Sequence, residues 1–267
     1  MIGRPSLAKL AHAAGVPERT QEKDYVLAWL LAAMSASGDA GLVFKGGTAL
    51  RRCYFRGYRY SEDLDFTTVA TEMRAPFLSF ASAWCRWIGE EAGIRAEATP
   101  DTRNPARRVW IGYQGPLGSF RSAEIKLDVA TDERILLAPR SRPLLSEYSD
   151  LPDQRFAVST YDLAEIWAEK VRSLIQRSEP RDVYDLVALA RSDATLPKSG
   201  LGPFREKARA KGLRTDNLAA KLDEREPVLR QRWADRLRDQ VRSLPDFDGE
   251  WRTLRRALRQ TGYLQGD

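Results

Sequence analysis

A chain of 267 residues with 43% hydrophobic and 30% charged residues is a folded globular protein of one or two domains, not a disordered one. No apolar run reaches the roughly 18 residues of a membrane span, and the N-terminal segment lacks the apolar core of a signal peptide, so we expect a cytoplasmic protein without a membrane partner. The single histidine, His12, excludes His-dependent triads and His-rich zinc sites, which leaves any chemistry to carboxylates, Lys, Arg and bound metal.

Positive charge is concentrated near the C-terminus. The net charge is +6, and from Leu201 onward 16 Lys and Arg residues stand against 11 Asp and Glu residues, so most of the excess lies in this tail. A basic tail on a nearly neutral body suggests a polyanionic partner such as RNA, and the alternative is a solvated helical face.

Hydrophobic periodicity predicts helices and strands in the first half of the chain. Apolar residues at helical spacing predict helices over 19–35 and 75–88, and a helix start over 48–54. Short apolar or alternating segments predict strands over 42–44, 64–67, 109–113 and 121–130. In the last strand, Lys126 and Asp128 lie on one face and the apolar residues lie on the other.

The second half of the chain reads as nearly all helix. The stretch 138–152, which contains prolines, predicts a connection between lobes. Beyond it we expect helices over 160–176 and 181–191, a loop around 197–203, one helix through 229–241 and a last one through 251–258. The expected fold is therefore α+β, with a mixed sheet and flanking helices in an N-terminal lobe (1–150) and a helical C-terminal lobe (151–267).

A Gly-Gly pair follows the first predicted strand, in the segment FKGGTALRRCYFRGYRYSEDLDFT (44–67). A strand that runs through Gly46 and Gly47 into a helix lets the backbone approach a phosphate closely and directs free N–H groups toward it. Thr48 would add a hydroxyl to this site. Taken alone, Gly-Gly-Thr is more often a tight turn.

Two aspartates follow about fifteen residues later. If Asp63 and Asp65 lie on a strand, their carboxylates share one face about 6.5 Å apart. Such a pair attracts a divalent ion, and Mg²⁺ prefers oxygen ligands while it keeps other positions for water and nucleotide phosphates. The alternative is a turn with two solvated aspartates, but the upstream glycines favour the metal site. Asp128 is the candidate third carboxylate, as metal ligand or base, unless it pairs with Lys126.

A lysine lies within the apolar stripe of the predicted helix 160–176. Glu165 and Glu169 fall on the opposite side, which we expect to face solvent, while Lys170 falls among the apolar residues. Because burial of an unpaired ammonium is costly, Lys170 either extends to water or meets an anion, such as a triphosphate or a catalytic carboxylate.

The next segment is rich in charged residues. Pro180 predicts a helix start, and the helix dipole favours Asp182 in its first turn. Asp185 projects away from the apolar stripe, so we expect it to face solvent or another lobe. A cleft between lobes would bring it opposite the two aspartates, where Arg177 and Arg181 are natural phosphate ligands.

Together these motifs resemble the AbiEii family of nucleotidyltransferase toxins, which includes the MenT toxins and belongs to the DNA polymerase β-like superfamily. The residues that carry the resemblance are FKGGTAL at 44–50, Ser61-x-Asp63-Leu64-Asp65-Phe66, Glu169-Lys170 and Arg181-Asp182-x-x-Asp185-Leu186, preceded by QEKDY at 21–25. The similarity runs from about residue 20 to about residue 190 and leaves out the basic tail.

The resemblance implies a toxin that transfers NMP from an NTP, with Mg²⁺ (or Mn²⁺) as cofactor, RNA and above all the tRNA 3′ end as acceptor, and a cognate antitoxin as partner. It implies that Asp63 and Asp65 bind Mg²⁺, that Gly47, Thr48 and Ser61 hold the phosphates, that Lys170 contacts the nucleotide and that Asp185 is a catalytic carboxylate. Together with the residue patterns above, we expect a site in which Asp63, Asp65, Lys170 and Asp185 are catalytic and Asp63, Asp65 and Asp128 hold metal. The nucleotide-binding residues that we expect are Lys45, Gly46, Gly47, Thr48, Ser61, Arg177 and Arg181. The superfamily's more usual Gly-Ser is Gly47-Thr48 here, which keeps the hydroxyl. The alternatives are transfer to a protein side chain or a small molecule, or a non-catalytic binding module.

Overall fold

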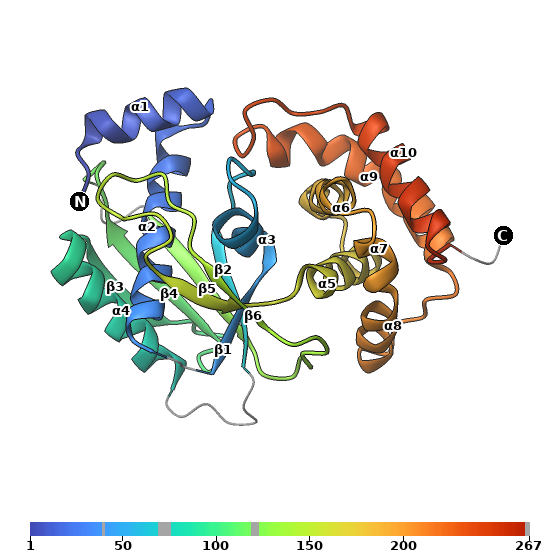
Figure 1. The fold of residues 1–267 in the computed structure, drawn as a ribbon, viewed down its shortest axis with the longest axis horizontal. Helices are drawn as coiled ribbons and strands as arrows, with labels where there is room; N and C mark the ends of the chain where they lie inside the picture. Colours follow the sequence, from blue (N-terminus) through green and yellow to red (C-terminus); the bar gives the residue numbers. More distant parts are fainter. Residues whose placement is uncertain (39–40, 69–75, 119–122, 265–267) are drawn as a thin grey trace. The chain divides into compact units, whose positions relative to one another are not determined.

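The computed structural model describes residues 1–38, 41–68, 76–118 and 123–264, in two compact units. Unit 1 comprises residues 1–133, 139–160 and 239–242, and unit 2 comprises residues 134–138, 161–238 and 243–267, within these described ranges. Unit 1 contains a sheet with flanking helices and unit 2 is helical (Figure 1), which confirms the α+β class.

Unit 1 is built on a mixed sheet of seven strands among the described residues, in the order β3-β4-β5-β2-β1-β7-β6. The strands are β1 (Leu42–Lys45), β2 (Asp63–Thr68), β3 (Arg95–Pro100), β4 (Arg108–Gln114), β5 (Glu124–Ala130), β6 (Arg140–Pro143) and β7 (Ala157–Thr160). The central strand β2 runs antiparallel to β1 and parallel to β5. Residues on one face of these three strands are therefore direct neighbours.

The core of unit 1 lies between this sheet and the helices α1 (Arg4–Ala14), α2 (Glu18–Ala36) and α4 (Phe77–Ala92). The rings of Phe44 of β1 and Phe66 of β2 pack at a tilt of 38°, with 5.5 Å between their centroids, and the ring of Phe66 lies 6.0 Å from that of Trp84 of α4. Each such buried side chain contributes about 1.5–3 kcal/mol. Because side chains alternate along a strand, burial of Leu64 and Phe66 turns Asp63 and Asp65 to the other face.

The chain turns sharply between β1 and β2. The helix α3 (Gly46–Ala49) begins directly after β1, two residues earlier than expected, and passes into a π-helical turn, η1 (Leu50–Tyr54). The hydrogen bonds of a π turn span one more residue than those of an α-helix, and such turns are frequent at functional sites.

Unit 2 holds six helices within the described residues. They are α5 (Leu163–Gln176), α6 (Pro180–Ser192), α7 (Leu196–Ser199), α8 (Leu201–Ala210), α9 (Leu218–Leu237) and α10 (Phe247–Gln260). No helix in the described part of the chain has the length and apolar character needed to cross a membrane.

Three expectations about the elements were wrong. The loop expected around 197–203 is helical, because Pro197 occupies the first turn of α7, where its missing N–H is harmless. The helix expected to run to Val241 ends at Leu237, since residues 239–242 belong to unit 1. The stretch expected to connect the lobes, 138–152, lies in unit 1 from residue 139 onward and contains β6, which pairs with β7. Residues 121 and 122 of one expected strand lie outside the described residues.

Candidate active site

Asp63 and Asp65 lie on one face of β2, as the alternation of the sequence predicts. Both side chains are partly exposed, while Leu64 and Phe66 between and after them are buried. The register of β2 and β5 sets Lys126 opposite Asp63 and Asp128 opposite Asp65. Three carboxylates and one ammonium therefore share this face of the sheet.

Two basic side chains hold Asp128. Arg108 of β4 donates from Nε to its Oδ1 at 2.8 Å, and Lys126 Nζ lies 3.1 Å from its Oδ2. The same Nζ lies 3.3 Å from Asp63 Oδ2. The sequence left open whether Asp128 would pair with Lys126, and in this structure it does, while Lys126 also reaches Asp63.

The charges of this group shift its proton equilibria. Burial, and next the charge of Asp63, raise the pKa of Asp65 above its usual value, against the opposing effect of Lys126 and Lys45. Burial by itself would lower the pKa of Lys126, but Asp63, Asp65 and Asp128 together outweigh it and raise this pKa. The face is therefore rich in negative charge that Lys126 balances only in part.

This donor set fits a divalent ion. Two strand carboxylates with a raised pKa on one of them are hard oxygen ligands in need of positive charge, and they leave the other positions of an octahedral ion for water and phosphate. Among the described residues, no three acidic, His or Cys side chains converge into a ready-made metal cage. The pair Asp63 and Asp65 is accordingly the candidate metal-binding element, with Asp128 on the neighbouring strand β5.

The two glycines after β1 each make room for a different side chain. Gly46 has a φ of +83°, and a Cβ placed on it would lie 2.9 Å from Asp65 Oδ2. A Cβ on Gly47 would lie 2.5 Å from Arg59 Nη2 and 3.1 Å from Ser61 Oγ. The Gly-Gly pair thus brings the backbone against one candidate metal ligand and against a buried arginine.

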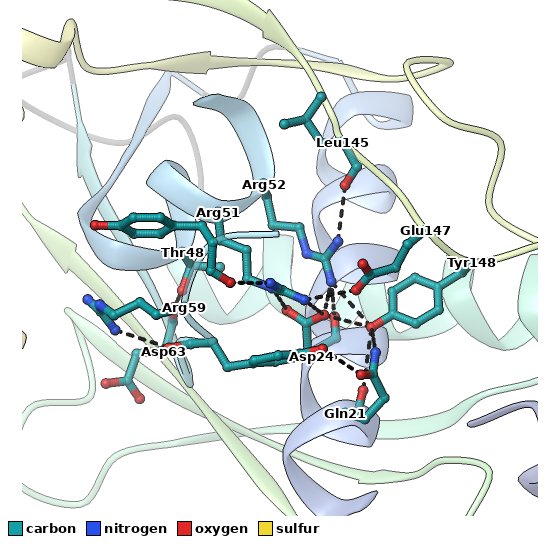
Figure 2. Close-up of polar contacts among 12 residues, drawn as sticks. Gln21, Asp24, Thr48, Arg51, Arg52, Arg59, Asp63, Leu145, Glu147 and Tyr148 are labelled. Atoms are coloured by element: carbon teal, nitrogen blue, oxygen red, sulfur yellow. Dashed lines mark hydrogen bonds and ion pairs between the residues drawn. The ribbon is translucent and has the colours of Figure 1, made fainter. Parts of the chain in front are cut away.

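The other residues expected around the phosphates lie close by. Thr48 donates from Oγ1 to the backbone oxygen of Asp63 at 2.6 Å, which ties α3 to the start of β2 (Figure 2). Ser61 is buried beside Gly47, and Lys45 lies opposite Asp65 in the register of β1 and β2. Arg59, which is 2% exposed, was not among the site residues predicted from the sequence. The one signal in the sequence was its position two residues before Ser61.

A buried polar network fixes the far side of the same turn (Figure 2). Asp24 of α2 accepts from Arg51 Nε at 2.7 Å, from Arg52, and from the hydroxyl of Tyr148 at 2.6 Å. Burial would raise the pKa of Asp24, but Arg52 and Arg51 outweigh it and lower this pKa. The QEKDY segment therefore contributes an anchor for η1 in unit 1.

In unit 2, Lys170 of α5 meets two carboxylates of α6. Its Nζ lies 2.8 Å from Asp182 Oδ1 and 2.7 Å from Asp185 Oδ2, and both aspartates are fully buried. The sequence left open whether Lys170 extends to water or meets an anion, and in this structure it meets the two carboxylates. Asp185 was expected to face solvent or another lobe; it is buried because it pairs with Lys170.

Arginine side chains border this group. Arg177 donates from Nε to Asp182 Oδ2 at 3.0 Å and is about half exposed, and Arg181 on α6 is partly exposed. Burial would raise the pKa of Asp182, but Lys170 and Arg177 outweigh it and lower this pKa.

The solvent position expected for Glu165 was wrong, and Glu169 is mostly buried. Glu165 accepts from the backbone N–H groups of Leu136 and Leu137 at 2.9 Å each. Lys207 of α8 lies 2.9 Å from the carboxylate of Glu165 and 3.2 Å from that of Glu169. The stripe pattern could not indicate this, because the partners come from α8 and from residues 134–138.

The predicted site residues fall into two groups, one in each unit. Unit 1 brings together Lys45, Gly46, Gly47, Thr48, Ser61, Asp63, Asp65 and Asp128, and adds Arg59, Arg108 and Lys126. Unit 2 brings together Lys170, Arg177, Asp182 and Asp185, with Arg181 on the same helix as the two aspartates.

The chain matches, over residues 29–260, the family described as nucleotidyl transferase AbiEii toxin, type IV TA system. Among solved structures it is similar to MenT4, a nucleotidyltransferase toxin of Mycobacterium tuberculosis, with 19% identity, 98% of this chain and 89% of that chain covered, and a TM-score of 0.71. A protein of H. pylori, provisionally described as a nucleotidyltransferase, has 16% identity, 92% and 96% coverage, and a TM-score of 0.55. At these identities the likeness shows the fold. No curated protein matches the sequence.

Proposed function

The chain belongs to the AbiEii family of nucleotidyltransferase toxins of type IV toxin–antitoxin systems, and we propose that it transfers NMP from an NTP to the 3′ end of a tRNA. In this reaction the oxygen of the acceptor hydroxyl forms a bond to the α-phosphorus. The bond from that phosphorus to the bridging oxygen breaks, and pyrophosphate leaves. The observation that carries the proposal is the Asp63–Asp65 pair packed against the Gly46-Gly47 turn.

Asp63 and Asp65 would hold Mg²⁺, or Mn²⁺ in its place. The bound ion supplies charge neutralisation on the triphosphate and on the departing pyrophosphate. The raised pKa of Asp65 is consistent with this assignment, because burial and next the charge of Asp63 raise it, and the charge of a bound cation would offset both.

Cationic side chains near each of the two groups would bind phosphate oxygens. In unit 1 these are Lys45 and Arg59, next to the glycine turn and Ser61. In unit 2 they are Lys170, Arg177 and Arg181, of which Lys170 is oriented by two buried carboxylates. A guanidinium offers parallel donors to phosphate oxygens, which suits the two arginines to this role.

A third carboxylate would accept the proton of the attacking hydroxyl. Asp128 is supported by the register of β5, which sets it opposite Asp65, and by the Arg108 bond that fixes its orientation. Asp185 is the other candidate, and its contact with Lys170 favours a role in orienting that lysine instead.

The RNA acceptor is supported by a basic hollow in unit 2. It has a volume of about 390 Å³ and is lined by Trp251, Arg252, Arg255, Arg256 and Arg259 of α10 and by Asp223 and Glu226 of α9. Asp223 pairs with Arg255 at 2.6 Å, and Glu226 accepts from Trp251 Nε1 at 2.6 Å. Four arginines against two engaged carboxylates leave the hollow positively charged, which suits a phosphate backbone.

The acceptor is tested by incubation of the purified protein with each labelled NTP, Mg²⁺ and total RNA, and with total protein in parallel. We expect label in tRNA with the native protein and none with Asp65→Asn. Label in protein and none in RNA would overturn the proposed acceptor.

The hollow is tested by RNA binding as a function of salt. Replacement of Arg252, Arg256 and Arg259 by Gln should reduce the slope of log K against log [salt] by about 2–3, because each lost phosphate contact removes about 0.7–0.9. Arg214→Gln, an exposed arginine paired with Asp216, is the matched control. An unchanged slope in the triple variant would remove the hollow from the RNA-binding surface.

Membership of a type IV toxin–antitoxin family implies an antitoxin as partner. We propose that this partner neutralises transfer, and the labelling assay repeated with the co-expressed neighbouring gene product tests it. Undiminished transfer in its presence would exclude that product as the antitoxin.

A further inference from the structure

Four residues between α9 and α10 are part of unit 1. Residues 239–242 lie against the segment that leads into β2, where the backbone oxygen of Gln240 accepts from Tyr60 N at 2.8 Å. Arg242 lies beside Gly15, whose added Cβ would be 3.3 Å from Arg242 Cγ. The segment 239–242 therefore contacts unit 1 at Tyr60 and at Gly15, both of which are far from it in sequence.

The side chain of Gln240 reaches Arg59. Its Oε1 accepts from Arg59 Nη1 at 3.0 Å, and the same Nη1 donates to the backbone oxygen of Tyr60 at 3.0 Å. Gln240 is 9% exposed and Arg59 is 2% exposed. Burial of a guanidinium is costly unless its N–H groups find acceptors, so these two oxygens stabilise Arg59 in this place.

The other end of the guanidinium faces the glycine turn. Arg59 Nη2 occupies the space that a Cβ on Gly47 would fill, at 2.5 Å from that position. Ser61 Oγ lies at 3.1 Å from the same position. A buried cation is thus directed at the point where the proposed function puts phosphate oxygens.

The chemistry of position 240 is specific. An amide oxygen accepts a hydrogen bond from a guanidinium without neutralising it, whereas a carboxylate would form an ion pair and reduce the positive charge available to a phosphate. Because Gln240 is a neutral partner, it orients Arg59 without itself offsetting the positive charge.

We propose that Gln240 is a positioning residue of the nucleotide site, which holds Arg59 against Gly47 as a ligand for the triphosphate of the NTP. This inference rests on the proposed function for the identity of the ligand. It assigns to residues 239–242, which lie beyond the motifs of the N-terminal half, a part in nucleotide binding.

The test compares Gln240→Glu with the native protein by direct binding of Mg²⁺-NTP and by the KM for NTP. Gln240→Glu keeps an acceptor for Arg59 and strengthens the contact, so the melting temperature should be unchanged or higher, but the affinity for NTP should fall about tenfold, because an added carboxylate offsets the cation. The KM for RNA should stay as in the native protein. Gln114→Glu, at the partly exposed last residue of β4, is the matched control for added charge.

The outcomes separate the two proposals. Equal NTP affinity in the native protein and in Gln240→Glu would overturn the positioning role and leave Gln240 a purely structural residue. NTP binding that falls in Gln240→Glu, together with a native protein that labels no RNA, would support the positioning role and overturn the proposed acceptor.

Discussion

The ammonium of Lys126 lies 3.3 Å from the carboxylate of Asp63 and 3.1 Å from that of Asp128, on the face of the sheet that carries the candidate metal ligands. This follows from the parallel register of β2 and β5, which sets Lys126 opposite Asp63 and Asp128 opposite Asp65. A lysine is therefore the counter-ion of these carboxylates in the fold itself. It stands in competition with any divalent ion for Asp63.

Replacement of Lys126 by Gln should make the protein depend on metal for stability. Without metal, the three carboxylates repel one another and the melting temperature should fall, while Mg²⁺ should raise it by more than in the native protein. Thermal melts in EDTA and in a Mg²⁺ series measure both effects, with Lys9→Gln on exposed α1 as the control. An equal Mg²⁺ effect in variant and native protein would contradict the competition.

Replacement of Asp65 by Asn should stabilise the metal-free protein while it abolishes transfer. A carboxyl group whose pKa is raised in the folded state stabilises the fold while protonated, below its ordinary pKa near 4, and this contribution is lost as the pH rises through the raised pKa. At pH 7 the ionised Asp65 therefore destabilises the fold. We therefore expect the free energy of unfolding in EDTA at pH 7 to be higher in the variant than in the native protein.

Urea unfolding at pH 7 and at pH 4 measures this difference, which should shrink at the lower pH. If the variant were less stable than the native protein at pH 7, Asp65 would stabilise the turn through its contacts, and the prediction would be wrong.

Replacement of Asp182 by Asn should destabilise unit 2. The loss of stability should depend on pH in the sense opposite to the effect of Asp65→Asn. The pKa of Asp182 is lowered, so its stabilisation is present above the unfolded value near 4 and is lost as the pH falls through the folded pKa. At pH 7 the loss should be about 3 kcal/mol, because Lys170 and Asp185 stay buried with one partner fewer. Urea unfolding between pH 7 and pH 3 checks it; a constant difference across this range would refute the ion-pair account.

Replacement of Gly47 by Ala should displace Arg59. The added Cβ would lie 2.5 Å from Arg59 Nη2, so the guanidinium must move away from the turn, with an expected cost of about 1–3 kcal/mol and a weaker affinity for NTP. Gly112→Ala on β4 is the control, because nothing lies within 4 Å of its Cβ and its φ is ordinary. Equal stability and NTP affinity in both variants would show that the turn tolerates a side chain.

Local periodicity was enough for several features of the site. The alternation at 63–66 predicted that Asp63 and Asp65 share a face, and the position of Lys170 among apolar residues predicted an anion or water as its partner. Pro180 predicted the start of α6. These features depend on the direction of side chains over a few residues, which the periods of strand and helix determine.

Which partner each side chain finds was decided only by the tertiary structure. Lys126 meets Asp63 because β5 lies beside β2 in one register, Asp185 is buried because α6 packs on α5, and Gln240 reaches Arg59 across 181 positions. Strand order, register and helix packing result from burial of the whole core, to which every element contributes. A window of a few residues along the chain contains no information about the burial of the whole core.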